Sequence, residues 1–363
     1  MQTYSSQPQR ATNQEFVASI FNPKEERDRT KIDELKKDSS LRIIDSIESQ
    51  VRELFKLRDP EGFGSYQDLS AKIHNYLGEK PNEYGVWVYY PWRHCLVHIV
   101  GESEFIELRT NRNLYKITAE EQRLLSTKTI GVVGLSVGNS VALTLAMERI
   151  GGHLVLADYD HLEVSNLNRI RSGLPDLDIQ KTVIAARQIA EIDPFLKVTL
   201  FSEGLSEDNM NAFLNPKEGM DLLVEVCDSI HLKVKSRLKA RMLKIPVIMD
   251  TNDKGMVDIE RFDLEPNRPI FHGLVDEEKL ANLEKLEGKE MLNVVSQIIS
   301  VENVSERLKK SMPEIGKTIT SWPQLASGVS LGGAISANVS RRILLNHFRS
   351  SGRFYVDLDQ TIK

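Results

Sequence analysis

The residues best suited to chemistry follow two short apolar runs in the middle of the chain. A turn of small residues, Gly134-Leu-Ser136-Val-Gly138, comes directly after the first run, and the second run ends at an acid, Asp158. Glycines let backbone amides approach phosphate oxygens closely, and a helix N-terminus favours negative charge. An acid at the end of the second strand is suited to a ribose hydroxyl. The stretch therefore predicts the opening of a nucleotide-binding βαβ unit.

Further polar residues follow the later apolar runs or lie just beyond them. They are Asp160, Asn166, Arg169, Lys181 and Asp228. Two cations, Arg169 and Lys181, suit a triphosphate, and a lone acid such as Asp228 suits Mg2+ held together with phosphate oxygens. This set predicts chemistry on ATP rather than simple binding of a dinucleotide. Each residue also has a plainer interpretation, because the cations could be surface charges and Asp228 could cap a helix.

Three other functions remain open on the same residues. The turn satisfies G-x-S-x-G, the nucleophile elbow of hydrolases, but that function leaves Asp158 unexplained and lacks the strands and oxyanion loop expected upstream. An NAD- or FAD-binding oxidoreductase fits the distance from Gly134 to Asp158, although Ser136 and Asn139 interrupt the full G-x-G-x-x-G pattern. A non-catalytic nucleotide-binding scaffold is the third alternative, and release of pyrophosphate would separate it from an enzyme.

The segments that must position these residues alternate between two kinds of pattern. Continuous apolar runs, which lack the alternation of a half-exposed strand, are separated by segments of helical periodicity. This order is typical of a mainly parallel sheet with helices on both faces, so we predict a Rossmann-like α/β fold. The expected strands are residues 130–133, 154–157, 196–201, 222–226 and 246–250, and the expected helices include residues 179–192, 207–214 and 232–244.

The rest of the chain divides around this fold. An α+β extension is predicted at the N-terminus, with a helix over residues 41–57 and an aromatic strand pair over residues 84–100. The expected domains are an N-terminal helical arm with the strand pair (1–108), a nucleotide-binding domain (109–273), a charged helical insertion (274–321), and a C-terminal helix and strand that complete the nucleotide-binding domain (322–363).

Composition limits the partners of the chain. It has 363 residues, 40% hydrophobic and 27% charged, with a formal net charge of −5, which gives no electrostatic reason to expect nucleic acid as a main partner. No run approaches the ~20 apolar residues of a membrane span, so no membrane association is expected. The polar N-terminus lacks the apolar core of a signal peptide, and we expect a cytoplasmic protein. Two cysteines are too few for an all-cysteine zinc site.

The acid pair Asp158-Tyr-Asp160, followed by Ser165-Asn166-Leu-Asn-Arg169, resembles the ThiF/MoeB/HesA family, the bacterial relatives of ubiquitin-activating enzymes. The likeness covers residues 109–273 and resumes over residues 322–359. It implies that Asp158 binds the ATP ribose and that Asp228 holds Mg2+. For the phosphates it implies three further residues: Asn166, Arg169 and Lys181.

The same resemblance implies a reaction and partners. The reaction is adenylation of a carboxylate, usually the C-terminus of a ubiquitin-like protein or peptide, with release of pyrophosphate. Arg109-Thr-Asn-Arg112-Asn matches the family's R-x-x-R-Q segment except at its last position, which implies that Arg112 reaches the partner subunit's site in a homodimer. The paired zinc cysteines and the thioester cysteine of some members are missing, so no zinc and no cysteine relay are expected. The N-terminal extension is similar to the ThiF-like part of proteins that carry a nitroreductase-like domain further on.

Overall fold

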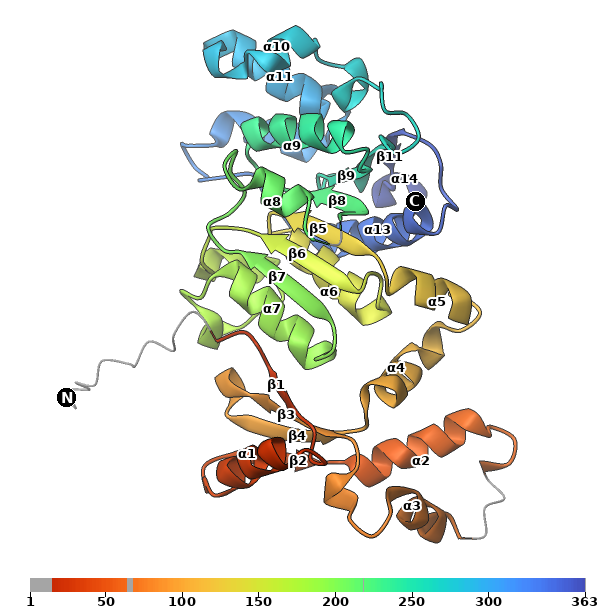
Figure 1. Ribbon diagram of the computed structural model, residues 1–363. Helices are drawn as coiled ribbons and strands as arrows, with labels where there is room; N and C mark the ends of the chain where they lie inside the picture. Colours follow the sequence, from red (N-terminus) through yellow and green to blue (C-terminus); the bar gives the residue numbers. More distant parts are fainter. Residues whose placement is uncertain (1–14, 64–67, 218, 363) are drawn as a thin grey trace, which may run out of the picture. The chain divides into compact units, whose positions relative to one another are not determined.

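The computed structural model describes residues 15–63, 68–217 and 219–362 (Figure 1). The chain forms two compact units. The first holds residues 15–119 together with Ala190–Phe195, and the second holds Glu120–Ile189 together with residues 196–362. The helical arm predicted at the N-terminus begins in the first 14 residues, which lie outside the described part.

A four-stranded sheet organises the first unit. Its strands, in the order β1-β3-β4-β2, are β1 (Ser19–Phe21), β3 (Val86–Tyr90), β4 (Cys95–Ile99) and β2 (Arg42–Asp45). The predicted aromatic strand pair is the antiparallel hairpin β3–β4. The helices of this unit are α1 (Glu26–Lys36), α2 (Ile47–Arg58), α3 (Leu69–Leu77) and α4 (Glu102–Thr110). Trp87 and Leu96 lie in the core beneath α1.

The predicted helix over residues 41–57 is wrong in its first part. Residues Arg42–Asp45 form strand β2, which pairs in parallel with β4 and places Ile43 opposite Leu96 and Ile44 opposite Val97. The periodicity of this segment also fits a helix, but the two adjacent β-branched residues favour a strand once an open sheet edge is available. The helix begins only at Ile47.

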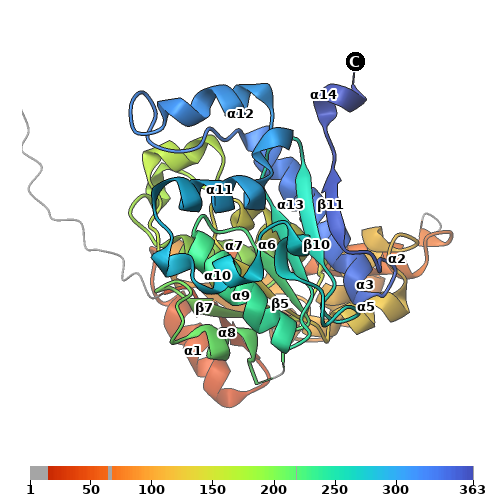
Figure 2. The ribbon, with the colours of Figure 1, turned by 90° about the horizontal axis from the view of Figure 1, so that it is seen from above.

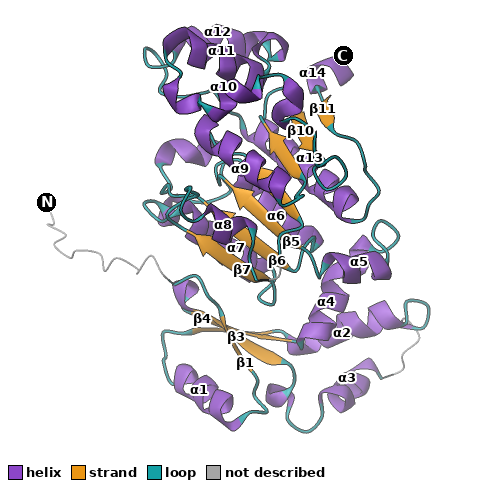
Figure 3. Cartoon of the chain, turned by 45° about the horizontal axis from the view of Figure 1, so that its top comes forward, coloured by secondary structure: helices purple, strands orange, loops and turns teal. Residues whose placement is uncertain are grey.

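A seven-stranded sheet organises the second unit, with strand order β11-β10-β9-β8-β5-β6-β7. Figure 3 shows its strands between helices. The five strands from β9 to β7 run in parallel, while β10 and β11 add an antiparallel edge. The bounds are β5 (Thr129–Val133), β6 (His153–Ala157), β7 (Lys197–Phe201), β8 (Leu222–Glu225), β9 (Val247–Asp250), β10 (Met256–Glu260) and β11 (Gly352–Tyr355).

Helices cover both faces of this sheet. The crossovers α6 (Gly138–Glu148) and α7 (Lys181–Ile192) lie on one face, where Asn139 of α6 bonds Gln188 of α7, and α8 (Met210–Leu214) and α9 (Ile230–Met242) lie on the other. The predicted Rossmann-like α/β fold is therefore confirmed. The remaining helices are α5 (Ala119–Leu125), α10 (Glu277–Ala281), α11 (Gly288–Ile299), α12 (Glu306–Ser311), α13 (Ala326–Leu344) and α14 (Leu358–Thr361).

The small residues of α13 allow it to pack closely. A Cβ atom added at Gly333 would clash with the Ser140 Oγ atom of α6, and one added at Gly332 would clash with Asp250 Oδ2. Figure 2 shows α13 beside β10, and α13 packs against α6. Within the described ranges, no helix is both long and apolar enough to cross a bilayer.

Candidate nucleotide-binding site

The carboxyl ends of three adjacent strands bring the predicted residues together. Strand β5 lies between β6 and β8, all three are parallel, and Val133 pairs with Ala157 on one side and Glu225 on the other. The residues that follow these strands therefore meet at one edge of the sheet, where open α/β sheets bind ligands. We call the following five residues the strand-end site: Gly134, Asp158, Arg169, Lys181 and Asp228.

The turn after β5 is shaped by close backbone contacts. Gly134 has a φ of +87°, and a Cβ atom there would lie 2.8 Å from the Cα atom of Cys227, in the turn after β8. A Cβ atom at Gly138 would lie 2.8 Å from Val132 Cγ1. Since other residues would clash at both positions, the glycines let this turn lie flat against its neighbours.

Helix α6 begins directly after this turn, at Gly138. Its N-cap residue, Val137, is itself in the right-handed helical region, and no side chain of the described residues caps this helix. The first amides of a helix have no partner within the helix, and they carry the positive end of its dipole. This end of α6 therefore suits an anion such as phosphate.

Asp158 ties the glycine turn to the loop after β6. Its Oδ2 accepts a hydrogen bond from the Leu135 N–H at 2.5 Å, and its Oδ1 accepts one from the Asp160 N–H at 2.8 Å. Burial raises the pKa of the Asp158 carboxyl, and the two amide bonds oppose this rise. Asp158 thus orders the turn in addition to its predicted role at the ribose.

Lys181 and Asp160 form a close pair at the start of α7. The Lys181 Nζ atom lies 2.7 Å from Asp160 Oδ2, and the Lys181 N–H donates to the Asp160 carbonyl at 2.9 Å. The lysine side chain is buried, with 7% exposed, whereas that of Asp160 is 49% exposed. The predicted phosphate cation is therefore held in place by an acid that faces solvent.

Arg169 reaches the glycine turn through Ser136. Its Nε donates to Ser136 Oγ at 3.0 Å, and its guanidinium also donates to Asn168 Oδ1 at 2.9 Å. Burial lowers the pKa of Arg169, and the Asp228 carboxylate opposes this effect. Among the described residues no histidine bonds Ser136, which argues against a hydrolase nucleophile. The serine that departs from the glycine pattern instead orients a cation.

Asn166 has a local structural role. It is buried, and its Oδ1 accepts a hydrogen bond from the Glu163 N–H at 3.2 Å, which closes a capping box at the start of the 3-10 turn η5 (Val164–Asn168). The amide therefore fixes the loop that carries Arg169. Its predicted contact with phosphate stays a prediction.

Asp228 differs from Asp158, the other acid of the strand-end site, because it is exposed. No hydrogen bond or ion pair involves its carboxylate within the described part of the chain. The alternative in which it caps α9 is wrong, since Ser229 is the N-cap and its Oγ accepts from the Leu232 N–H at 3.3 Å. An exposed carboxylate without a hydrogen bond or ion pair, which interacts electrostatically with Arg169 and follows the end of a strand, fits a Mg2+ ion that is shared with phosphate oxygens.

Arg112 belongs to the first unit rather than to the unit that carries the strand-end site. It is exposed on the 3-10 turn η4 (Asn111–Asn113). Its proposed action in a partner subunit stays a prediction.

A set of buried charges that was not predicted from the sequence begins at Glu225, three residues before Asp228. Glu225 and Arg237 are completely buried and lie 2.5 Å apart, and Arg237 Nε donates to Glu260 Oε2 at 2.8 Å. Lys233 Nζ lies 2.9 Å from Glu225 Oε1. We call Glu225, Lys233, Arg237 and Glu260 the buried charge network. Burial alone would raise the pKa of Glu225, but Lys233 and Arg237 bring it below its usual value.

The sequence does carry a signal for this network. Glu225 interrupts an otherwise apolar strand, and Lys233 and Arg237 are four residues apart, which places both on one side of α9. A charge in a strand that is buried on both faces requires a partner, so this spacing could have been used to pair them.

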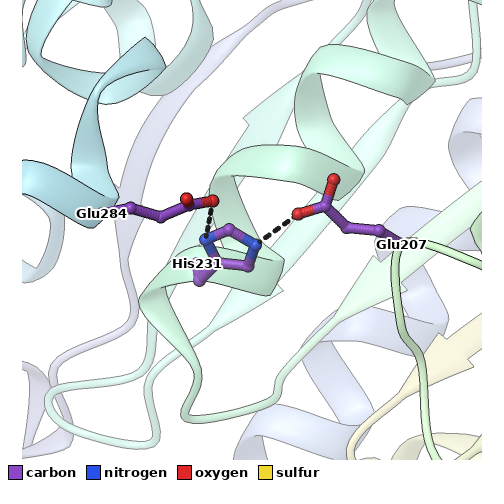
Figure 4. A group of neighbouring side chains, drawn as sticks. All are labelled: Glu207, His231 and Glu284. Carbon is purple, nitrogen blue, oxygen red and sulfur yellow. Dashed lines mark hydrogen bonds and ion pairs between the residues drawn. The ribbon is translucent and has the colours of Figure 1, made fainter.

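A second cluster of polar side chains lies on the surface of α9. Figure 4 shows the His231 ring between two carboxylates, with Nε2 2.8 Å from Glu207 Oε1 and Nδ1 3.9 Å from Glu284 Oε1. The carboxylates approach opposite nitrogens, and Lys235 Nζ lies within 3.4 Å of Glu207 and 3.9 Å of Glu284. The ligand atoms are close enough for a metal ion. The shared lysine and the exposure of both acids identify it as a solvated ion-pair cluster.

The two cysteines are free. Burial raises the pKa of the Cys227 thiol, and burial also raises that of Cys95. A protonated thiol is a poor nucleophile, so neither residue has the environment of a thioester-forming cysteine.

Comparison with known proteins supports the resemblance in the sequence. Residues 108–321 match the ThiF family. An uncharacterized protein of Mycobacterium tuberculosis is 41% identical over 334 residues, which cover 91% of this chain and 44% of that protein. The chain thus spans less than half the length of this relative.

Two better-characterised proteins are more distant. The molybdopterin-synthase adenylyltransferase of Haemophilus influenzae is 23% identical over 62% of this chain and 92% of its own length. The crystal structure of the E. coli tRNA N6-threonylcarbamoyladenosine dehydratase, TcdA, matches with a TM-score of 0.48 and 18% identity, over 66% of this chain and 95% of that one. The family match covers more than half of the chain, including strands β5 to β10. This chain therefore belongs to the ThiF family.

Proposed function

We propose that this protein is a Mg2+-dependent adenylyltransferase that activates a carboxylate as an acyl-adenylate. The observation that carries the proposal is that the glycine turn, Arg169 and Asp228 lie at one edge of the sheet. The hydrogen bond from Arg169 to Ser136 joins the cation to the turn. Membership of the ThiF family and the adenylyltransferase among its relatives support the same reaction.

In this reaction a carboxylate oxygen of the substrate attacks the α-phosphorus of ATP. A carbon–oxygen–phosphorus linkage forms, the bond between the α-phosphorus and the bridging oxygen breaks, and pyrophosphate leaves with that oxygen. No side chain of the enzyme needs to become a nucleophile. Positioning and neutralisation of charge supply the catalysis, which agrees with a site made of Arg, Lys, Asn and Asp.

Each residue of the site has a role in this proposal. Asp158 binds the ribose, and Asp160 holds Lys181 in place. The backbone of the glycine turn, with Gly134 and Gly138, admits the phosphates. Arg169 neutralises their charge, together with Asn166 and Lys181. Asp228 would hold Mg2+, which supplies further neutralisation of the phosphate charge when it is bound.

The proposed substrate is the C-terminal carboxylate of a protein or peptide. The relative from H. influenzae is named for its action on molybdopterin synthase, which is a protein. A direct test compares peptides that carry a free C-terminal carboxylate with the same peptides carrying an amidated C-terminus. Pyrophosphate release from ATP with the free acids alone is the expected result. Equal release with both forms, or ATP hydrolysis to ADP, would contradict the proposal.

We also propose a homodimer in which Arg112 completes the partner subunit's site. Arg112→Ala and Arg169→Ala subunits should each be inactive alone, and mixed dimers should recover about a quarter to a half of the activity, because one intact composite site can form. Mixed dimers without any recovery, with dimer formation verified by mass, would contradict an arginine supplied in trans.

A further inference from the structure

The turn that carries Asp228 is held by a buried side chain, that of Glu225. Strand β8 ends at Glu225, three residues before Asp228, and the Glu225 side chain is completely buried. Its Oε1 accepts a hydrogen bond from the Cys227 N–H at 3.0 Å. This amide lies beyond the end of the strand. It therefore bonds the Glu225 side chain instead of a neighbouring strand.

Basic side chains of α9 fix the same carboxylate from the other side. Lys233 Nζ lies 2.9 Å and 3.2 Å from its two oxygens, and Arg237 donates to Oε2 at 2.5 Å. Arg237 is fixed in turn by Glu260, whose Oε1 accepts from the Phe271 N–H at 2.6 Å. Glu225 therefore has little freedom to move away from the Cys227 amide.

The neighbouring backbone restricts the turn as well. The Val226 N–H donates to the Val133 carbonyl at 2.9 Å, and the Cα atom of Cys227 packs against Gly134. Residues 226 and 227 are thus held by β5 on one side and by Glu225 on the other. Asp228 is the next residue along the chain, and its exposed carboxylate points from a backbone that these contacts fix.

We propose that Glu225, paired with Lys233 and Arg237, is a positioning residue that sets the place of Asp228 through the Cys227 amide. Glu225, held by Lys233 and Arg237, thereby determines how tightly the strand-end site binds Mg2+ together with ATP. Partners beyond the direct metal ligands commonly set metal affinity in this way, since they fix the orientation of a ligand. The inference rests on the proposed function, because it requires Mg2+ at Asp228.

The test measures the Mg2+ concentration that half-maximally strengthens ATP binding, by calorimetry on the whole chain. A Glu225→Met, Lys233→Met double variant removes the acceptor and its charge partner together, which leaves Arg237 paired with Glu260. We expect its Mg2+ midpoint to rise about tenfold, as for loss of other outer partners of metal ligands. A Glu225→Gln, Lys233→Met variant restores only an acceptor for the Cys227 amide, and its midpoint should return most of the way to that of the wild type.

Glu260→Gln is the matched control, because it weakens the same network without contact to Cys227. It should lower the midpoint of thermal unfolding while its Mg2+ midpoint stays within twofold of the wild type. Equal Mg2+ midpoints for the wild type and the Glu225→Met, Lys233→Met variant would overturn the inference. If Mg2+ does not change the affinity of the wild type for ATP, the proposed function is overturned, and the inference with it.

A measurement on the wild type covers the case in which the double variant does not fold. Hydrogen exchange should show protection of the Cys227 amide, although this amide lies outside the strand ladder. Exchange of this amide at the rate of an unstructured peptide would mean that Glu225 does not hold the turn, and would contradict the inference.

Discussion

The strand-end site and the buried charge network both hold charged side chains around the end of β8, but they differ in how these charges are buried and paired. In the network, Glu225 and Arg237 have no exposed surface and each contacts at least two partners. At the site, three residues later in the chain, Asp228 is exposed and has neither a hydrogen bond nor an ion pair with a described residue. A satisfied charge supports structure, whereas a carboxylate left open to solvent is available to a ligand.

The comparison predicts different consequences for substitution in the two regions. Changes in the network should mainly lower the free energy of unfolding. Changes at the strand-end site should mainly lower nucleotide binding and turnover.

The largest effect is expected for Arg237→Met. Removal of one partner from a buried ion pair leaves an uncompensated charge, and we expect a loss of about 3–5 kcal/mol in the free energy of unfolding. Urea denaturation measures this loss, and Asp228→Ala, in the turn between β8 and α9, serves as the comparison, with a change below about 0.5 kcal/mol. Similar losses for both variants would break the distinction between the two regions.

Asp250, at the end of β9, is buried like the network, but its Oδ2 has no partner among the described residues. Burial raises its pKa to about 7, well above the ordinary value of an aspartate. Between pH 4 and pH 7 the folded protein therefore holds a proton that the unfolded chain releases, so stability falls as the pH rises through this range. The stability cost is complete above pH 7.

Asp250→Asn removes this titration. The variant should gain stability relative to the wild type as the pH rises from 4 to 8, by up to about 4 kcal/mol for a shift of three pKa units. Urea denaturation of both proteins at several pH values measures the difference, in which the titrations of other groups cancel. A difference that stays constant with pH would show that Asp250 is ionised in the folded protein.

Asp228→Ala tests the role of the strand-end site in turnover. We expect a loss of about 100-fold in Mg2+-dependent ATP turnover, equivalent to about 3 kcal/mol of transition-state stabilisation, with the fold retained. Glu207→Ala removes an exposed acid from the surface cluster around His231 and should leave turnover unchanged. Turnover at the wild-type rate in Asp228→Ala would refute the metal role.

The smallest effect is expected for Ser136→Ala. This change removes the acceptor for Arg169 Nε, so the guanidinium should be less well oriented and ATP binding should weaken about threefold to tenfold, or roughly 1 kcal/mol. Thr144→Ala removes a hydroxyl that bonds the Ser140 carbonyl within α6, and it provides the control. Unchanged ATP affinity in Ser136→Ala would mean that this serine does not orient Arg169.

The sequence was sufficient to predict which residues of the strand-end site lie together, because parallel strands bring their carboxyl ends to one edge of the sheet. The order of β5, β6 and β8 could therefore be used to group Gly134, Asp158 and Asp228, and the predicted fold and family are confirmed. What Ser136 does could not be predicted, since its bond to Arg169 depends on the path of the intervening loop.

Other features depend on contacts between segments that are distant in sequence. Glu260 joins the buried charge network only because β10 pairs antiparallel with β9, which brings it to Arg237 of the helix before β9. Strand β2 was predicted as helix, because its periodicity is ambiguous and its pairing with β4 spans about fifty residues. Local patterns carry no information about either partner.

The most direct test of the account is calorimetric binding of ATP, with and without Mg2+, beside NAD and FAD, on the wild type and Asp158→Ala. We predict that ATP binds, that Mg2+ strengthens this binding, and that Asp158→Ala weakens it. Binding of NAD or FAD without binding of ATP would contradict the account and favour an oxidoreductase-associated site.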